Sequence, residues 1–205
     1  EDVQKFGGME ALDEPYMEIR LGARSRKRAG LLCALCIGEV LTATAMGYFE
    51  GEISKVVVLV LFIPLIISSG GNSGSQATSL IIRAMALREV TLKDWWRVAS
   101  RELPSGIVLG IILGVIGFIR IMLWQKFGWY DYGVYHTLVA VTVAGALVGV
   151  VTFGSLAGSM LPFVLRRFNF GPASASAPFV ATLVDVTGLI IYFSVAFVIL
   201  RGTLL

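Results

Sequence analysis

The stretch PLIISSGGNSGSQATSLIIRAMALRE, residues 64–89, decides the fold of this chain. It begins within a run of Val, Leu and Ile, becomes small and polar between Ser68 and Ser79, and then turns apolar again. Glycines and polar side chains occur at membrane depth where helices pack closely or where they line a water-filled cavity. The glycines alone fit close packing, whereas Asn72 and Gln76, one helical turn apart, favour a polar path.

The composition is that of an integral membrane protein. Of 205 residues, 56% are hydrophobic and 15% are charged, and the mean hydropathy is +0.80. Soluble domains carry about 25% charged residues. The net charge of +3 gives no indication of nucleic-acid binding. Cys33 and Cys36 have Cys-x-x-Cys spacing, but they lie in an apolar stretch without a second pair, so we expect packing residues rather than a redox or zinc pair.

Five apolar stretches are long enough to cross a bilayer, which requires about 20 residues of helix. We therefore predict an all-α integral membrane fold with five transmembrane helices. The predicted spans are Gly30–Phe49, Val56–Ile82, Leu103–Trp124, Tyr135–Val164 and Ala177–Leu200.

The positive charges lie mainly on one side of these spans. Cytoplasmic loops of membrane proteins are rich in Lys and Arg, so we expect a cytoplasmic N-terminus and a C-terminus outside. Tryptophans and tyrosines near the span ends stand where interfacial aromatic belts occur. The cytoplasmic set would be Arg20, Arg24, Arg26, Lys27, Arg28, Arg83, Arg88, Lys93, Arg97, Arg101, Arg166 and Arg167, against Lys55, Arg120, Lys126 and Arg201 on the other side.

Residues 1–29 form a polar region before the first span. They are acidic up to Glu18 and basic from Arg20, and they begin without methionine or a signal-peptide pattern. We expect a piece of a longer protein, in which residues 1–29 are an amphipathic lead-in to a membrane domain of residues 30–205. Composition favours a solvated linker for the acidic part, with a cation-binding or partner-binding helix as the alternative.

Two ionisable residues lie well inside predicted spans, where such groups are costly and often functional. Glu39 is followed by Thr42, so it could be protonated or hydrogen-bonded internally, and a structural role is an equal alternative. Asp185 is the sharper candidate. Glu102 and Arg120 lie near span ends, where long side chains can reach the interface.

Asp185 lies about 10 Å along a helix from Pro178, at 1.5 Å per residue. Its helical face carries Ala181, Thr182 and Gly188, which leave room beside the carboxylate for water, an ion or a neighbouring helix. Oxygen donors suit hard cations such as Mg²⁺ or Ca²⁺. One carboxylate is too little for a dry site, but two copies across a two-fold axis could hold a hydrated cation.

The motifs GGN-x-G-x-Q at residues 70–76 and P-x-VAT-x-x-DVTG at residues 178–188 are specific. Segments 64–87 and 177–196 resemble the transmembrane domain of the MgtE magnesium channels, and residues 1–16 resemble the end of that family's connecting "plug" helix. The resemblance implies a homodimer of five-helix protomers in a bacterial plasma membrane, among lipid, with an Mg²⁺-selective pore between subunits. It also implies N-terminal and CBS regulatory domains before residue 1, and no enzymatic activity.

Residue roles follow from this resemblance by position. Asp185 would hold hydrated Mg²⁺, with the Ala181 carbonyl beside it, and the second and fifth helices would form the pore. Three positions differ from the pattern of some family members, which carry Gly in place of Ser68, Asn in place of Ser75 and Asn in place of Ala177. These differences affect the hydrogen bonds expected at the gate and the selectivity of the pore. The pore-lining set would be Ser68, Gly71, Asn72, Ser75, Ser79, Thr182 and Gly188, and Glu1 and Asp2 would bind regulatory Mg²⁺.

Other functions fit the residues less well. A secondary transporter that exchanges Mg²⁺ or another divalent cation for Na⁺ or H⁺ is the main alternative, because Glu39 could couple proton movement to transport. An aspartyl protease would need a second membrane aspartate, and a serine hydrolase would need His136 to reach mid-span Ser73 or Ser75. The glycine-rich stretch lacks the lysine of a phosphate-binding loop. A purely structural module would leave Asp185 unexplained.

Overall fold

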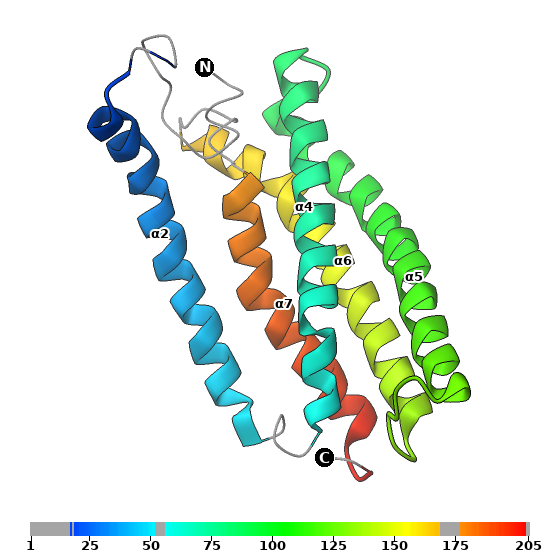
Figure 1. Ribbon diagram of the computed structural model, residues 1–205. Coiled ribbons are helices and arrows are strands. Elements are labelled where there is room, and N and C mark those ends of the chain that lie inside the picture. The colour runs from blue at the N-terminus through cyan, green and yellow to red at the C-terminus, as the bar shows by residue number, and fades with distance from the viewer. Residues whose placement is uncertain (1–16, 18, 52–55, 169–176, 204–205) are drawn as a thin grey trace.

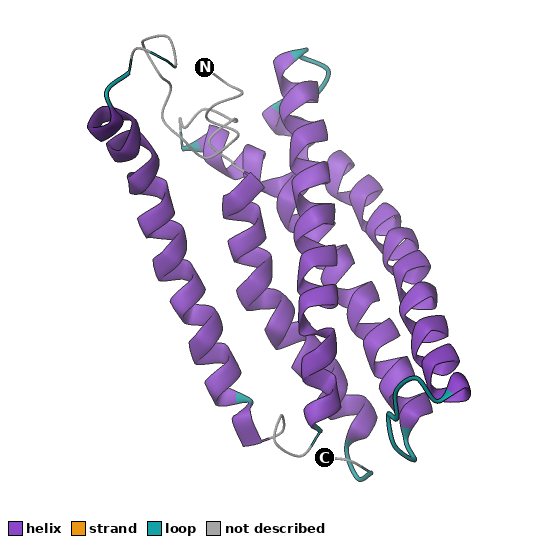
Figure 2. Cartoon of the chain, in the orientation of Figure 1, coloured by secondary structure: helices purple, strands orange, loops and turns teal. Residues whose placement is uncertain are grey.

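The computed structural model describes residues 17, 19–51, 56–168 and 177–203, and within these ranges every regular element is a helix (Figure 2). Five of the helices are long and apolar enough to cross a membrane. The prediction of an all-α fold with five membrane-length helices is therefore confirmed. In chain order the elements are α2 (Leu21–Tyr48), the 3₁₀ helix η1 (Val57–Phe62), α4 (Ile63–Ala86), the 3₁₀ helix η2 (Leu92–Asp94), α5 (Trp95–Phe127), α6 (His136–Arg167) and α7 (Ala177–Leu200).

The helices run side by side, with α2 at one edge of the molecule and α5 at the other (Figure 1). The start of α2 and the end of α7 lie at opposite ends of the bundle (Figure 1). This arrangement agrees with an odd number of crossings. Packing is most extensive between α5 and α6 and between α4 and α6, whereas α2 packs chiefly against α7.

Two helices begin earlier than the apolar spans predict. The first starts at Leu21 rather than near Gly30, because the basic residues before the span are good helix formers. The third starts at Trp95 rather than Leu103, after a capping box in which the backbone N–H and hydroxyl of Thr91 both donate to Asp94. Charged residues at these ends therefore continue the helices.

The second span is not one uniform helix. It opens as the 3₁₀ helix η1, and α4 begins only at Ile63, with Pro64 in its first turn. Proline is tolerated there because that N–H has no partner within the helix. Pro178 likewise lies in the first turn of α7.

A close glycine contact joins α4 to α6. Gly70 faces Gly154 and Gly74 faces Gly158, and a Cβ atom on either α6 glycine would overlap the facing carbonyl oxygen of α4. Small residues at such spacing let helix backbones approach within a membrane. We call these four glycines the glycine contact, and they confirm close packing as one role of the stretch that follows Ser68.

Buried hydroxyl groups reinforce the same interface. The Ser73 and Ser155 hydroxyls lie 2.6 Å apart in a hydrogen bond between α4 and α6. Thr78 donates to the Gly158 carbonyl oxygen at 2.7 Å. All three side chains are buried, so their polar atoms need these partners.

The end of the bundle opposite the start of α2 holds an arginine and several aromatic rings. Arg120 donates from Nη1 to the Tyr132 hydroxyl at 3.0 Å, and its guanidinium lies over the rings of Phe62 and Trp124. These cation–π contacts stabilise the positive charge of Arg120 close to the end of α5. Cys33 and Cys36 are free thiols on the exposed surface of α2.

Candidate functional site

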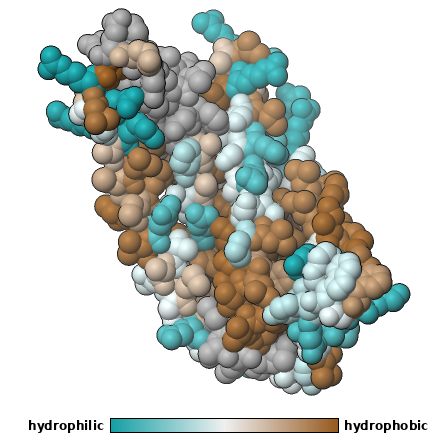
Figure 3. All heavy atoms as spheres, viewed as in Figure 1, coloured by the Kyte–Doolittle hydropathy of each residue, from teal (hydrophilic) through white to brown (hydrophobic). Residues whose placement is uncertain are grey.

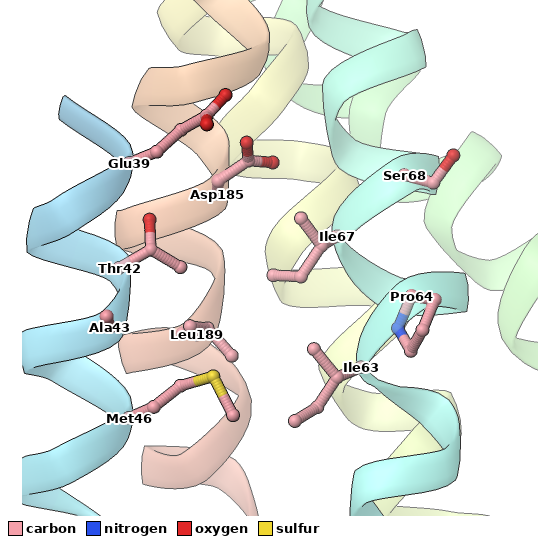
Figure 4. A pocket seen from close by; sticks show the side chains of 10 residues that line it. All are labelled: Glu39, Thr42, Ala43, Met46, Ile63, Pro64, Ile67, Ser68, Asp185 and Leu189. Atoms are coloured by element: carbon pink, nitrogen blue, oxygen red, sulfur yellow. The ribbon is translucent and has the colours of Figure 1, made fainter. Parts of the chain in front are cut away.

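Asp185 lies in a pocket of about 530 Å³ between α2, α4 and α7 (Figure 4). It shares this pocket with a second acidic residue, Glu39 from α2, and with a hydroxyl residue, Ser68 from α4. The structure therefore brings together residues far apart in the sequence. The full lining is Glu39, Thr42, Ala43, Met46, Ile63, Pro64, Ile67, Ser68, Asp185 and Leu189.

Helical spacing explains why these side chains share one pocket. On α2, Glu39, Thr42 and Met46 recur at intervals of three and four residues, which places them on one face. On α7, Asp185 and Leu189 are one turn apart. Each helix thus presents one polar turn and one apolar turn to the pocket.

The two carboxylates are neighbours of the same charge. Figure 4 shows the Glu39 and Asp185 side chains next to one another. Asp185 is partly buried, and the residues that line the pocket include no Lys or Arg. Two like charges at membrane depth favour a bound cation, a proton or both.

The pocket also contains an unused hydrogen-bonding group. The Thr42 hydroxyl oxygen is buried and has no hydrogen-bond partner in the described part of the chain. It points toward the end of the pocket that holds the two carboxylates (Figure 4). Hydroxyl and carboxylate oxygens are the ligands preferred by Mg²⁺ and Ca²⁺.

Apolar side chains form much of the rest of the wall, among them Ile63, Ile67 and Leu189 (Figure 4). In the space-filling view, hydrophilic atoms lie at mid-height among hydrophobic surface (Figure 3). Within the described ranges, no three His, Cys, Asp or Glu side chains come together as a metal cage. A cation in this pocket would therefore keep much of its water.

The other α4 candidates lie along the helix beyond Ser68. Ser75 donates to the Ala177 carbonyl oxygen at 3.5 Å, and Gly71 is buried against Ala181 of α7. Asn72 and Ser79 are exposed in the single chain. The residues from Gly71 onward are not brought into the Asp185 pocket, so their pore-lining role stays a prediction.

Two α7 candidates face other helices of the same protomer. Thr182 packs against Gly38 of α2 and lines a separate apolar pocket. Gly188 is buried, and a Cβ there would meet Ile67 at 2.9 Å and Val150 at 3.1 Å. Their pore-lining roles also stay predictions, and the proposed regulatory residues at positions 1 and 2 lie outside the described residues.

From the sequence, Glu39 had two alternative roles, and the contribution of α2 to the pocket was not predicted. Thr42 and Met46 follow Glu39 at helical spacing, which is the signal that could have marked this face. The partner of that face could not be read from spacing, because it depends on the packing of α2 against α7.

Five membrane-length helices, with an acidic pocket between α2, α4 and α7, define a multi-pass membrane protein with the donor groups for a hard cation. The chain belongs to the MgtE family, whose model, described as "Divalent cation transporter", matches residues 63–195. The resemblance found in the sequence is therefore confirmed.

Three relatives carry the name "Magnesium transporter MgtE". The protein of Thermus thermophilus is 38% identical over 98% of this chain and 43% of its own length. Those of Enterococcus faecalis and Bacillus subtilis are 30% and 29% identical, over 98% and 96% of this chain and 42% and 41% of their own lengths. The chain thus spans less than half the length of these relatives.

Proposed function

We propose that this chain is the pore domain of a Mg²⁺ channel in which Asp185 holds the hydrated ion. The observation that carries the proposal is the position of Asp185, partly buried at mid-helix in a pocket with Glu39 and Ser68. Membership in a divalent cation transporter family and the names of the relatives support Mg²⁺ as the ion.

The size of the pocket is compatible with a hydrated ion. Mg²⁺ loses its waters reluctantly and is usually held through several of them. Six waters occupy about 180 Å³ at about 30 Å³ each, which is well within a pocket of about 530 Å³. Electrostatic selection through water then favours the ion of higher charge, because its attraction to a carboxylate is doubled.

The proposal includes a homodimer whose pore lies between subunits and is lined by α4 and α7. Two copies of Asp185 would face the pore, as the closed symmetry of most homo-oligomers allows. The N-terminus would be cytoplasmic in a bacterial plasma membrane and the C-terminus outside. Glu1, Asp2 and domains that precede them in the relatives would regulate the pore by binding cytosolic Mg²⁺.

The test is Mg²⁺ uptake into proteoliposomes by wild type, Asp185→Asn and Asp185→Ala. We expect Asp185→Asn to weaken uptake and Asp185→Ala to abolish it, in preparations with unchanged size-exclusion profiles. Undiminished uptake by Asp185→Ala would show that another residue holds the ion.

Exchange of Mg²⁺ for Na⁺ or H⁺ is the second candidate, and the location of Glu39 beside Asp185 is the observation in its favour. A channel needs only the Mg²⁺ gradient. Uptake that ignores imposed Na⁺ and pH gradients would support the channel, whereas uptake that stops without one of them would identify an exchanger.

A further inference from the structure

The α2 side of the acidic pocket carries chemistry that a single pore carboxylate does not explain. Glu39 is a costly residue at this depth, since an ionised carboxylate inside a membrane needs a compensating partner. In the described part of the chain its pocket neighbours supply no positive charge. Its nearest ionisable neighbour in the pocket, Asp185, has the same sign.

We infer that Glu39 is a second cation-binding carboxylate, which together with Asp185 and the Thr42 hydroxyl selects divalent over monovalent ions. This inference rests on the proposed function and adds a specificity-determining residue to its path. Two carboxylates within one protomer carry two negative charges, which a single divalent ion neutralises and a single monovalent ion does not.

The Thr42 hydroxyl supports this inference independently of the acidic pair. Serine and threonine hydroxyls in helices commonly donate to the carbonyl oxygen four residues earlier, as Thr44 does to Val40 at 3.1 Å. Thr42 on the same helix makes no such bond although its oxygen is buried. Its free oxygen points toward the carboxylates (Figure 4), where it can accept a hydrogen bond from a water of a hydrated ion.

The apolar walls strengthen this selection. Met46, Ile67 and Leu189 lower the local dielectric around the acidic end of the pocket, and Coulomb interactions increase as the dielectric falls. The carboxylates attract a divalent ion more strongly than a monovalent ion, and this difference in energy increases by the same factor as the dielectric falls. Glu39 therefore acts on selectivity most strongly where water is partly excluded.

The test compares Glu39→Gln with Glu102→Gln, a matched change in α5. Glu102 is also partly buried within a membrane helix, but it does not line the pocket. Mg²⁺ uptake into proteoliposomes is measured against Mg²⁺ concentration, at external Na⁺ concentrations that span about two factors of ten. A second readout is the rise in Tm of the purified protein with Mg²⁺, since a ligand of the folded state stabilises it.

We expect Glu39→Gln to raise the Mg²⁺ concentration for half-maximal uptake about tenfold, to increase inhibition by Na⁺ and to reduce the Mg²⁺-dependent rise in Tm. Glu39→Asp, which keeps the charge, should restore most of the loss, and Thr42→Val should cause a smaller loss of the same kind. Glu102→Gln should match wild type.

The outcomes separate this inference from the proposed function. If Glu39→Gln matches Glu102→Gln in uptake, Na⁺ inhibition and Tm while Asp185→Asn is impaired, the inference is overturned and the proposed function stands. If the Asp185 and Glu39 variants all match wild type, both are overturned. A loss in Glu39→Gln that Glu39→Asp reverses supports the inference, because Gln keeps the length of Glu39 without its carboxylate, whereas Asp keeps the carboxylate on a shorter side chain.

Discussion

The Tyr192 hydroxyl of α7 donates a hydrogen bond to the Leu59 carbonyl oxygen of η1 at 2.8 Å. Tyr192 is fully buried and lies among the core side chains that join α4, α6 and α7. The bond fixes the 3₁₀ entry of the second span against the fifth. It therefore sets the position of the first turn of α4, which lines the acidic pocket.

Tyr192→Phe should destabilise the protein by about 1 kcal/mol, because it removes a buried hydrogen bond while the ring is kept. Thermal unfolding in detergent should show the lower Tm. Ser194→Ala is the control, since the Ser194 hydroxyl is exposed and donates within its own helix, to the Ile190 carbonyl oxygen. Equal Tm values for the two variants would mean that the Tyr192 bond contributes nothing to stability.

Gly158→Ala should destabilise the protein by about 1–3 kcal/mol, because the added methyl group has no space against the Gly74 backbone. Gly30→Ala is the matched control. It also lies inside a helix, but a Cβ there meets nothing within 4 Å, so alanine should leave stability unchanged or raise it by up to about 1 kcal/mol. Denaturation curves of both variants test this contrast, and a stable Gly158→Ala would show that α4 and α6 can separate without cost.

Asp131, in the loop between α5 and α6, should make that loop sensitive to acid. The Gly133 backbone N–H and the Gln125 side-chain amide donate to its carboxylate, and these bonds lower the pKa of Asp131. A carboxyl group with a lowered folded-state pKa stabilises the fold above its unfolded value of about 3.9, and this contribution is lost as pH falls through the folded-state pKa.

Hydrogen exchange of the amides of residues 128–135 at pH 3 and pH 6, after correction for intrinsic rates, measures this effect. Protection should decrease at the lower pH in wild type and should change less in Asp131→Asn. The same pH dependence in both proteins would assign the acid sensitivity to another group.

The sequence predicted the helices well because apolar length is a local property. All five spans are present, and the last one has the predicted bounds, Ala177–Leu200. The starts of α2 and α5 were wrong, because hydropathy marks the part of a helix that suits lipid and not the charged turns that continue it.

The site was predictable only in part because it depends on contacts between distant helices. Asp185 could be selected from its depth alone. Of the two roles expected for the glycine stretch, close packing is confirmed and the polar path stays a prediction. The structure assigns Gly70 and Gly74 to packing against α6 and Ser68 to the acidic pocket. The neighbour of Glu39 could not be predicted, since spacing within α2 does not indicate which helix lies opposite.

The glycine contact also has a mechanical consequence. Where the α4 and α6 backbones are in direct contact, there is no free space between them, so the two helices resist sliding or tilting against each other. Helix α5 is also in close contact with α6 and adds to this stiffness. The slender contact of α2 with α7 offers far less resistance. Any change in the width of the acidic pocket is then chiefly a displacement of α2, which carries Glu39, because α7 with Asp185 is packed against both α4 and α6.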